Sequence, residues 1–325
     1  MTPTLAVTDL VKHFPIQKGL LAREVGQVRA VDGVSFAVAP GETLCVVGES
    51  GCGKSTVGRL ILRLLEPTAG TITFEGRDVG RLSRSDFRPL RQELQIVFQD
   101  PYASLNPRMR AGAIVGEPLE NFGTLGRAER KAHVAELFAK VGLPQDAMDR
   151  YAFEFSGGQR QRLGIARALA VAPKLIVADE PVSALDVSVQ AQVLNLMMDL
   201  KAEFGLAYLF ISHDLGVVEH VADRVAVMYL GQIVEIGTRA AIFAEPRHPY
   251  TKALMSAAPR PDPRAKRERI ILEGDVPSPA SPPAGCRFHT RCPFAFDRCR
   301  TEVPTLRDIS ADQKAACHLD EVGSS

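Results

Sequence analysis

The chain has 325 residues, 46% of them hydrophobic, enough to bury one large core and a smaller appendage. Its formal net charge of +1 at pH 7 creates no overall field that favours nucleic acid, so nucleic acid is not an expected partner. The first residues lack the apolar run of a signal peptide, and no stretch approaches the ~20 apolar residues that a membrane-spanning helix needs. We therefore expect a soluble chain that reaches a membrane only through a partner.

Short apolar runs alternate with longer helical patterns, an order typical of parallel strands covered by helices. The predicted buried strands are Thr43–Gly48, Leu175–Asp179 and Tyr208–Ser212. Two antiparallel hairpins are predicted, over residues 70–79 with a turn near Glu75-Gly76 and over residues 225–236 with a turn at Gly231-Gln232. The predicted helices cover residues 54–65, residues 157–170, and a stripe after Asp186 formed by Val189, Val193, Leu196 and Leu200.

Two changes in composition predict the domain organisation. Helical, charged sequence replaces the strand signal from about residue 102, which predicts a helical subdomain over about residues 102–165. Near Pro259 the sequence turns Pro- and Arg-rich, and cysteines follow. We expect a main domain over residues 1–258, and a Pro-rich linker and Cys-containing C-terminal domain over residues 259–325.

The first functional motif is a glycine-rich loop between a predicted strand and a predicted helix. It fits G-x-x-x-x-G-K-[ST] and consists of Gly48, Glu49, Ser50, Gly51, Cys52, Gly53, Lys54 and Ser55, with Thr56 next along the helix. Its glycines let backbone N–H groups surround a phosphate, Lys54 neutralises phosphate oxygens, and Ser55 supplies a hydroxyl for Mg²⁺. The loop therefore predicts binding of ATP with Mg²⁺. A chance glycine turn explains the combination of strand, helix, lysine and serine less well.

Two carboxylates end the predicted strand Leu175–Asp179. Asp179 lies where open α/β sheets bind ligands and suits the Mg²⁺ shell, and Glu180 suits polarising the attacking water. Strands often end in acids to make a turn, so this motif gains its meaning from Lys54 upstream.

A second glycine motif separates this chain from other phosphate-loop proteins. Phe155 precedes Ser156, Gly157, Gly158 and Gln159, and this string resembles the signature loop of the ABC transporter ATPases, with Phe155 in place of the usual leucine. Ser156 is a suitable N-cap, and the glycines expose N–H groups ahead of a helix, so the string predicts a second anion site. The resemblance covers nearly the whole chain. It implies an α/β fold: a P-loop NTPase (RecA-like) core with an antiparallel β subdomain, a helical subdomain and a small Cys-rich C-terminal extension.

Further positions match that family one by one. Gln99 resembles the glutamine that contacts Mg²⁺ or the water and reports to the membrane subunit, and His213 resembles the switch histidine that contacts the γ-phosphate. Ser183–Asp186 resembles the loop that crosses the dimer interface. Phe14 occupies the place of an aromatic that stacks on adenine, although a Phe near an N-terminus is more often part of a core. The resemblance thus implies catalytic roles for Glu180, His213 and Gln99.

The resemblance also implies partners. ATP is held in a head-to-tail dimer, between Lys54 of one subunit and the Ser156–Gly158 loop of the other. ATP binding closes the dimer, hydrolysis releases it, and the motion drives two transmembrane permease subunits at the cytoplasmic face of the inner membrane.

Three sequence motifs with no role in phosphate binding indicate a subfamily of the ABC transporter ATPases. The strings Phe98–Arg108, Pro246–Leu254 and Gly274–Pro293 are similar to the oligopeptide/dipeptide (and nickel) uptake subfamily. That subfamily implies import of di- or oligopeptides, a second, non-identical ATP-binding subunit, and an extracytoplasmic substrate-binding protein. The alternatives are a nickel or other small-solute importer and a soluble ABC ATPase without a transport role.

Four cysteines crowd the C-terminal region: Cys286, Cys292, Cys299 and Cys317. Four thiolates suit a [4Fe–4S] cluster or structural zinc, and relatives of the subfamily favour the cluster. The alternative is free buried thiols that pack a small lobe. Elsewhere, Cys52 lies at a predicted helix N-terminus beside Lys54, a setting that predicts a lowered thiol pKa.

Overall fold

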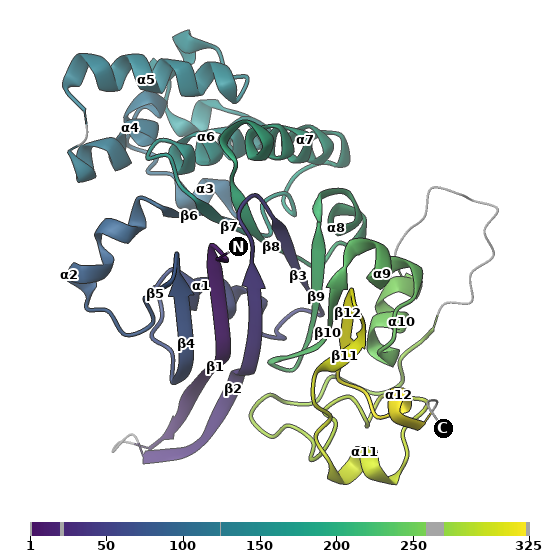
Figure 1. The fold of residues 1–325 in the computed structure, drawn as a ribbon. Helices are drawn as coiled ribbons and strands as arrows, with labels where there is room; N and C mark the ends of the chain where they lie inside the picture. Colours follow the sequence, from purple (N-terminus) through teal and green to yellow (C-terminus); the bar gives the residue numbers. More distant parts are fainter. Residues whose placement is uncertain (1, 20–22, 124, 258–269, 323–325) are drawn as a thin grey trace, which may run out of the picture. The chain divides into compact units, whose positions relative to one another are not determined.

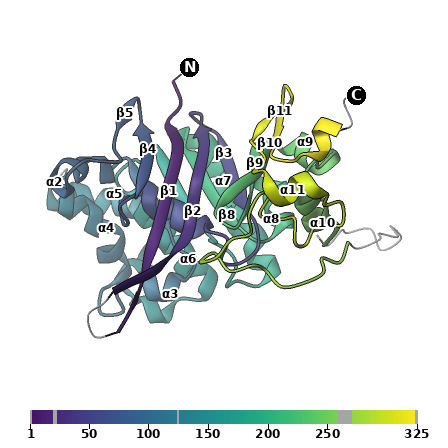
Figure 2. The ribbon, with the colours of Figure 1, turned by 90° about the horizontal axis from the view of Figure 1, so that it is seen from below.

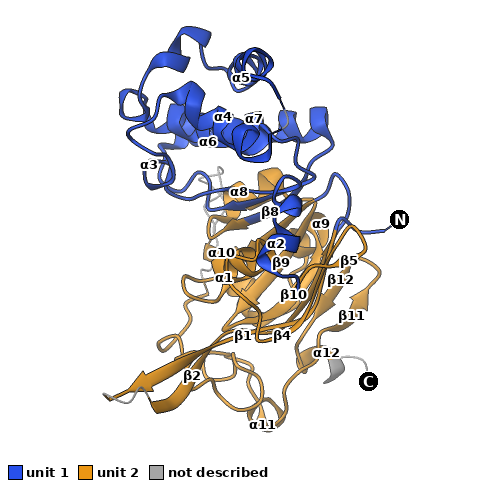
Figure 3. Ribbon diagram, turned by 90° about the vertical axis from the view of Figure 1, so that its left-hand side faces the viewer, with its two compact units in different colours: residues 1–4, 38–42, 81–210 blue, residues 5–37, 43–80, 211–325 orange. Residues whose placement is uncertain are grey.

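The structure is a computed structural model of the chain and describes residues 2–19, 23–123, 125–257 and 270–322. These residues form two compact units (Figure 3). Unit 1 comprises residues 1–4, 38–42 and 81–210, and unit 2 comprises residues 5–37, 43–80 and 211–325. The phosphate loop belongs to unit 2, whereas the paired carboxylates and the signature loop belong to unit 1. Each unit is described by itself.

Unit 2 contains two groups of strands. The first is a sheet of order β2-β1-β4-β5, and the second has the order β11-β12-β10-β9-β3. The strands are β1 (Leu5–Lys18), β2 (Arg23–Val38), β3 (Thr43–Val47), β4 (Ala69–Phe74), β5 (Arg77–Asp78), β9 (Arg224–Tyr229), β10 (Gln232–Thr238), β11 (Arg307–Ser310) and β12 (Gln313–Ala315). The helices are α1 (Lys54–Ile61), α8 (Leu215–Val221), α9 (Arg239–Ala244), α10 (Pro249–Ala257), α11 (Asp297–Thr301) and α12 (Leu319–Val322).

The core of unit 2 forms around β3, all of whose residues are buried. A strand buried on both faces must be apolar at consecutive positions, as β3 is. It pairs in parallel with β9, so that Leu44 lies opposite Arg224 and Val47 opposite Val227. β9 turns into the antiparallel strand β10 through Leu230-Gly231, one residue earlier than expected.

Four strands of unit 2 were not expected from the sequence. β1 and β2 are long neighbouring strands (Figure 2), and β1 pairs with β4 across a register shift between Thr8 and Val11. β11 and β12 form an antiparallel pair. β12 also pairs antiparallel with β10, so that Lys314 lies opposite Ile236. The C-terminal region thus extends the sheet that carries the phosphate loop.

Unit 1 is mainly helical (Figure 1). Its strands have the order β8-β7-β6 and are β6 (Leu94–Val97), β7 (Leu175–Asp179) and β8 (Ala207–Ser212), most of which lies in unit 1. Its α-helices are α2 (Arg84–Phe87), α3 (Pro101–Ser104), α4 (Ala111–Phe122), α5 (Arg127–Lys140), α6 (Gly157–Leu169) and α7 (Val187–Phe204). Its 3₁₀ helices are η1 (Pro89–Arg91), η2 (Gln145–Asp149) and η3 (Ala152–Glu154).

The central helix of unit 1 is α6, which packs against α3, α4, α5 and α7. Gly158 allows α6 to lie close to α7, since a Cβ there would lie 2.4 Å from Cγ1 of Val189. The apolar stripe of α7 differs from the expected one: Leu194 and Met197 are buried, while Val189 and Leu196 are only half-buried. No helix within the described residues is both long enough and apolar enough for a membrane span.

Candidate functional site

The phosphate loop leaves β3 at Gly48 and enters α1 at Lys54. Its glycines have positive φ, 154° at Gly48, 80° at Gly51 and 109° at Gly53, a region that favours residues without Cβ. Crowding adds a second requirement. A Cβ at Gly48 would lie 2.2 Å from the Met228 carbonyl oxygen, and one at Gly53 would lie 2.1 Å from that of Ala30. The loop backbone therefore packs directly against the backbone at Ala30 and Met228 of the same unit, and these contacts fix its conformation.

Lys54 points into this loop and is only 5% exposed. Its ammonium donates hydrogen bonds to the carbonyl oxygens of Gly48 (2.8 Å) and Glu49 (3.0 Å). Ser50 is exposed, and Ser55 and Thr56 are half-buried at the start of α1. A buried cation inside a glycine loop at a helix N-terminus fits a polyphosphate, and the Ser55 hydroxyl is a suitable oxygen donor for Mg²⁺.

The prediction for the Cys52 thiol was wrong in direction. Burial raises the pKa of Cys52, and the charge of Lys54 only partly opposes this effect. Cys52 is 5% exposed, so removal of its sulfur from water outweighs the helix terminus and the nearby cation. Cys52 lines the loop as a neutral thiol.

Two residues of unit 2 that the sequence analysis did not assign to the site hold Glu49. The Glu49 backbone N–H donates to the Tyr250 hydroxyl at 2.8 Å. The Arg291 guanidinium donates to both carboxylate oxygens of Glu49, at 2.9 and 3.3 Å. Both lie in strings noted only for their subfamily resemblance, and no local pattern marks them as partners of a loop so distant along the chain.

In unit 1, Asp179 and Glu180 follow the buried residues of β7 and are half-buried. Glu180 has a φ of 48°, a left-handed conformation that costs a non-glycine residue free energy and is found at functional turns. The Gln99 amide donates to the Glu180 carboxylate at 2.8 Å and to the Ser183 hydroxyl at 3.4 Å. The structure therefore brings together Gln99, Glu180 and the start of the Ser183–Asp186 loop.

The predicted cap of the signature helix is confirmed. The Ser156 hydroxyl accepts a hydrogen bond from the Gln159 backbone N–H at 3.3 Å, and the Gln159 side chain accepts one from the Ser156 N–H at 3.0 Å. This reciprocal pair fixes the first turn of α6. Gly158 is buried against Val189 of α7, while Gly157 is exposed near Leu185.

His213 and Phe14 lie in unit 2. His213 is exposed directly after β8 and before Asp214, which caps α8. Phe14 is half-buried on β1, with the Lys12 ammonium 5.1 Å from the centre of its ring. The roles predicted for both stay predictions.

The four C-terminal cysteines carry free thiols: Cys299 and Cys317 are buried, and Cys286 and Cys292 are partly exposed. Burial raises the pKa of Cys286 to about 11 and that of Cys317 to about 12. Among the described residues, no group of three or more His, Cys, Asp or Glu side chains is arranged to hold a metal ion. The arrangement does not fit the predicted iron–sulfur or zinc site.

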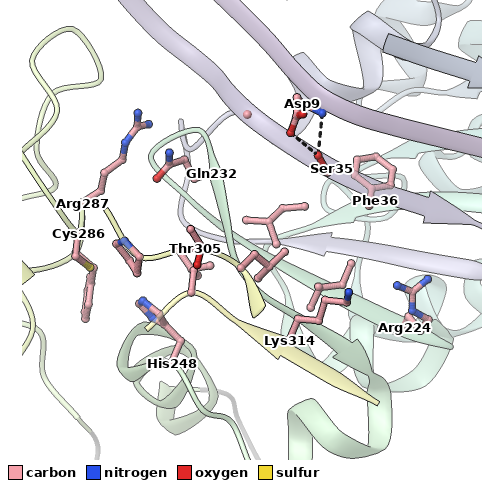
Figure 4. Close-up of a pocket in the computed structure, with 18 of the residues that line it drawn as sticks. Asp9, Ser35, Phe36, Arg224, Gln232, His248, Cys286, Arg287, Thr305 and Lys314 are labelled. Carbon is pink, nitrogen blue, oxygen red and sulfur yellow. Dashed lines mark hydrogen bonds between the residues drawn. The ribbon is translucent and has the colours of Figure 1, made fainter. Parts of the chain in front are cut away.

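A cavity of about 590 Å³ also lies in unit 2, between β1, β2, β10 and the C-terminal region (Figure 4). No residue of the phosphate loop lines it. Two of its cations are paired, Arg287 with Asp32 and Lys314 with Asp308, and Asp9 bonds to Ser35. It is therefore distinct from the phosphate loop.

Comparison with protein families gives two matches. The family described as ABC transporter matches residues 31–183. The family described as Oligopeptide/dipeptide transporter, C-terminal region, matches residues 234–299.

Individual proteins match over nearly the whole chain. The probable peptide ABC transporter ATP-binding protein y4tS of Sinorhizobium fredii is 58% identical over 97% of this chain and 89% of its own length. The oligopeptide transport ATP-binding protein AppF of Bacillus subtilis is 54% identical over 97% of both chains. The dipeptide transport ATP-binding protein DppF of Escherichia coli is 53% identical over 98% of this chain and 95% of its own.

Solved structures show the same fold. The ATP-binding cassette MJ0796, in a dimeric post-hydrolysis state bound to ADP and Pi, is 26% identical with a TM-score of 0.65, over 72% of this chain and 98% of its own. The protein cbiO1 of Clostridium perfringens, part of the ABC transporter complex cbiONQ, is also 26% identical with a TM-score of 0.65, over 75% and 92%.

Proposed function

Since this chain belongs to the family of ATP-binding subunits of oligopeptide and dipeptide ABC transporters, we propose that it drives di- or oligopeptide import by nucleotide-dependent closure of an ATPase dimer. The observation that carries this proposal is the pair of phosphate-binding devices in one chain: the Lys54 loop in unit 2 and the Ser156-capped α6 in unit 1.

Each residue near the nucleotide has a proposed task. Lys54 and the backbone N–H groups from Ser50 to Thr56 bind the phosphates, and Ser55, Asp179 and Gln99 are the oxygen donors that would hold Mg²⁺, which supplies charge neutralisation for phosphoryl transfer. Glu180 orients and deprotonates the attacking water. Its strained backbone and the Gln99 hydrogen bond hold this carboxylate in one position. His213 contacts the γ-phosphate, and Phe14 stacks on adenine.

The signature loop acts on a second chain in this proposal. Gly157, Gly158 and Gln159 form the first turn of α6, whose N-terminus favours an anion. One chain does not need two anion sites for one γ-phosphate. In a head-to-tail dimer both sites are used, because each ATP lies between the Lys54 loop of one chain and the signature loop of the other. The partner we propose is a second, non-identical ATP-binding subunit. Recovery of only one ATPase chain from the intact transporter would contradict that assignment.

An exposed aromatic patch on unit 1 suits a permease subunit. We define it as Tyr102, Tyr151, Phe153 and Arg160; its three rings are exposed. The rings of Tyr151 and Phe153 stack at 5.6 Å, and the Arg160 guanidinium lies 4.9 Å from the centre of the Tyr102 ring while donating to the Phe153 carbonyl. Exposed aromatic groups with an arginine are typical of protein interfaces. We propose that the permease docks here and holds the chain at the cytoplasmic face of the membrane, with a substrate-binding protein delivering peptide from outside.

The test is uptake of a labelled dipeptide, a longer peptide and nickel by cells that carry the parent protein or Lys54→Ala. Lys131→Ala is the control, because Lys131 is an exposed lysine on α5 of unit 1, whereas the phosphate loop belongs to unit 2. Loss of peptide uptake in Lys54→Ala alone supports the proposal. Loss of nickel uptake alone assigns the nickel alternative, and unchanged uptake of all three contradicts the transport proposal.

A further inference from the structure

The segment Cys286–Cys292, here called the C-terminal loop, packs on the same part of unit 2 as the phosphate loop. Its Phe288 is 1% exposed. The ring centre of Phe288 lies 5.3 Å from that of Tyr229, 5.4 Å from that of Tyr250 and 5.6 Å from that of His248. Such an aromatic cluster fixes the segment in place, because buried rings contribute both area and geometry.

With Phe288 in place, the Arg291 side chain reaches Glu49. The Arg291 side chain is 8% exposed and the Glu49 side chain 28% exposed, and two hydrogen bonds join them in the two-pronged arrangement of a strong guanidinium–carboxylate pair. Burial lowers the pKa of Arg291, but its interactions with Glu49 and Tyr229 together outweigh burial and raise that pKa. The guanidinium is therefore fully charged whenever the protein is folded.

Glu49 is a negative charge within a loop whose proposed ligand is a polyphosphate. Lys54 bonds to the backbone oxygen of Glu49, whereas Arg291 bonds to both oxygens of its carboxylate. A carboxylate without a counterion at this position repels the phosphates of ATP over the short distances of a loop, where screening is weaker than in bulk water. The Arg291 guanidinium cancels that charge.

A second contact connects the C-terminal loop to the phosphate loop through the β9–β10 turn. Arg287 donates to the Leu230 carbonyl and pairs with Asp32. The next residue after Leu230, Gly231, donates its N–H to the Cys52 carbonyl at 2.9 Å. The C-terminal loop thus supports the phosphate loop at two points, Glu49 and Cys52.

We propose that Arg291 is a positioning residue for nucleotide binding, which neutralises the Glu49 carboxylate so that the phosphate loop accepts ATP. This inference rests on the proposed function and deepens it, since it assigns the C-terminal region a part in ATP affinity. Arg291 affects the binding of Mg-ATP through Glu49. It takes no part in phosphoryl transfer, which we assign to residues of unit 1 and to His213.

The test measures the Kd for Mg-ATP of the purified full-length chain, and kcat at saturating Mg-ATP of the assembled transporter. Arg291→Gln is expected to raise Kd by about three- to tenfold, with kcat within about twofold of the parent value. Adding Glu49→Gln to Arg291→Gln is expected to return Kd to within about twofold of the parent, because the uncompensated charge is gone. The matched control is Arg298→Gln, whose exposed pair with Glu302 lies in the same region away from the phosphate loop and whose Kd should not change.

Salt gives an independent readout. The Kd penalty of Arg291→Gln should shrink as NaCl rises from about 50 to about 500 mM, because salt screens an electrostatic effect. Arg291→Lys, which keeps the charge but not the two-pronged geometry, should lie between the parent and Arg291→Gln, and it serves where Arg291→Gln fails to fold.

Three outcomes overturn the inference. The first is an unchanged Kd in Arg291→Gln, and the second is a double variant that binds Mg-ATP as weakly as Arg291→Gln. The third is a fall in kcat that explains all of the ATPase activity lost in Arg291→Gln. A parent protein that does not bind Mg-ATP overturns the proposed function itself, which keeps the two failures apart.

Discussion

The Gln99 amide holds the Glu180 carboxylate at 2.8 Å, and both belong to unit 1. The proposed catalytic base and the residue expected to report to the permease are therefore joined directly by a hydrogen bond. A movement of the segment around Gln99 changes the environment of Glu180 without any intervening side chain.

Glu180→Gln should lower ATP turnover about a hundredfold or more, because an amide cannot accept the proton of the attacking water. The substituted side chain keeps the size of the original, so binding should survive and an ATP-bound dimer should accumulate. Gel filtration with Mg-ATP, alongside single-turnover ATPase assays, measures both effects. Turnover at the parent rate would show that another residue is the base.

The packing of the signature helix gives a prediction with a built-in control. A Cβ at Gly158 would lie 2.4 Å from Cγ1 of Val189, whereas one at Gly157 would lie 3.4 Å from Leu185. Gly158→Ala should therefore destabilise the protein by about 1–3 kcal/mol, because Val189 is β-branched and must shift together with α7. Gly157→Ala should stay within about 0.5 kcal/mol of the parent. Denaturant unfolding of both variants measures the two changes in the free energy of unfolding. Equal stability of the two variants would show that α6 and α7 separate readily.

Cys52 should react slowly with iodoacetamide near neutral pH. Its pKa is raised, so the reactive thiolate is scarce at pH 7, and the rate should climb steadily as the pH is raised toward 9. Labelling followed by mass spectrometry, with Cys52→Ser to identify the modified site, gives the rate. Mg-ATP should slow it further. A faster reaction than that of a free thiol at pH 7 would contradict the raised pKa.

Local pattern accounts for the parts of the molecule where a short string fixes both conformation and chemistry. The positive φ angles at Gly48 and Gly53, the buried Lys54 and the reciprocal cap at Ser156 all follow from residue type at fixed spacing. For the same reason β3 and β7 were predicted to within one residue of their ends, since a strand buried on both faces carries a run of consecutive apolar residues.

Distant pairing accounts for what the sequence did not reveal. The register of β1 shifts near Asp9, whose φ is 47°. The alternation of apolar and polar residues is interrupted there, so the sequence shows no continuous strand pattern. β12 has three residues and is a strand because β10 and β11 lie on either side of it. Glu49 and Arg291 are 242 positions apart. The direction of the Cys52 pKa likewise depended on burial, which no neighbouring residue indicates.

Unit 2 is built from segments that lie far apart in the sequence, which sets an order for its synthesis. The phosphate loop emerges from the ribosome long before β12, which carries Gln313, and Gln313 donates a hydrogen bond to buried Glu235. Until then one edge of β10 has no neighbour, and an open strand edge pairs readily with other chains. A nascent chain that does not yet include β12 already carries the phosphate loop, yet it exposes a strand edge that can pair with other chains.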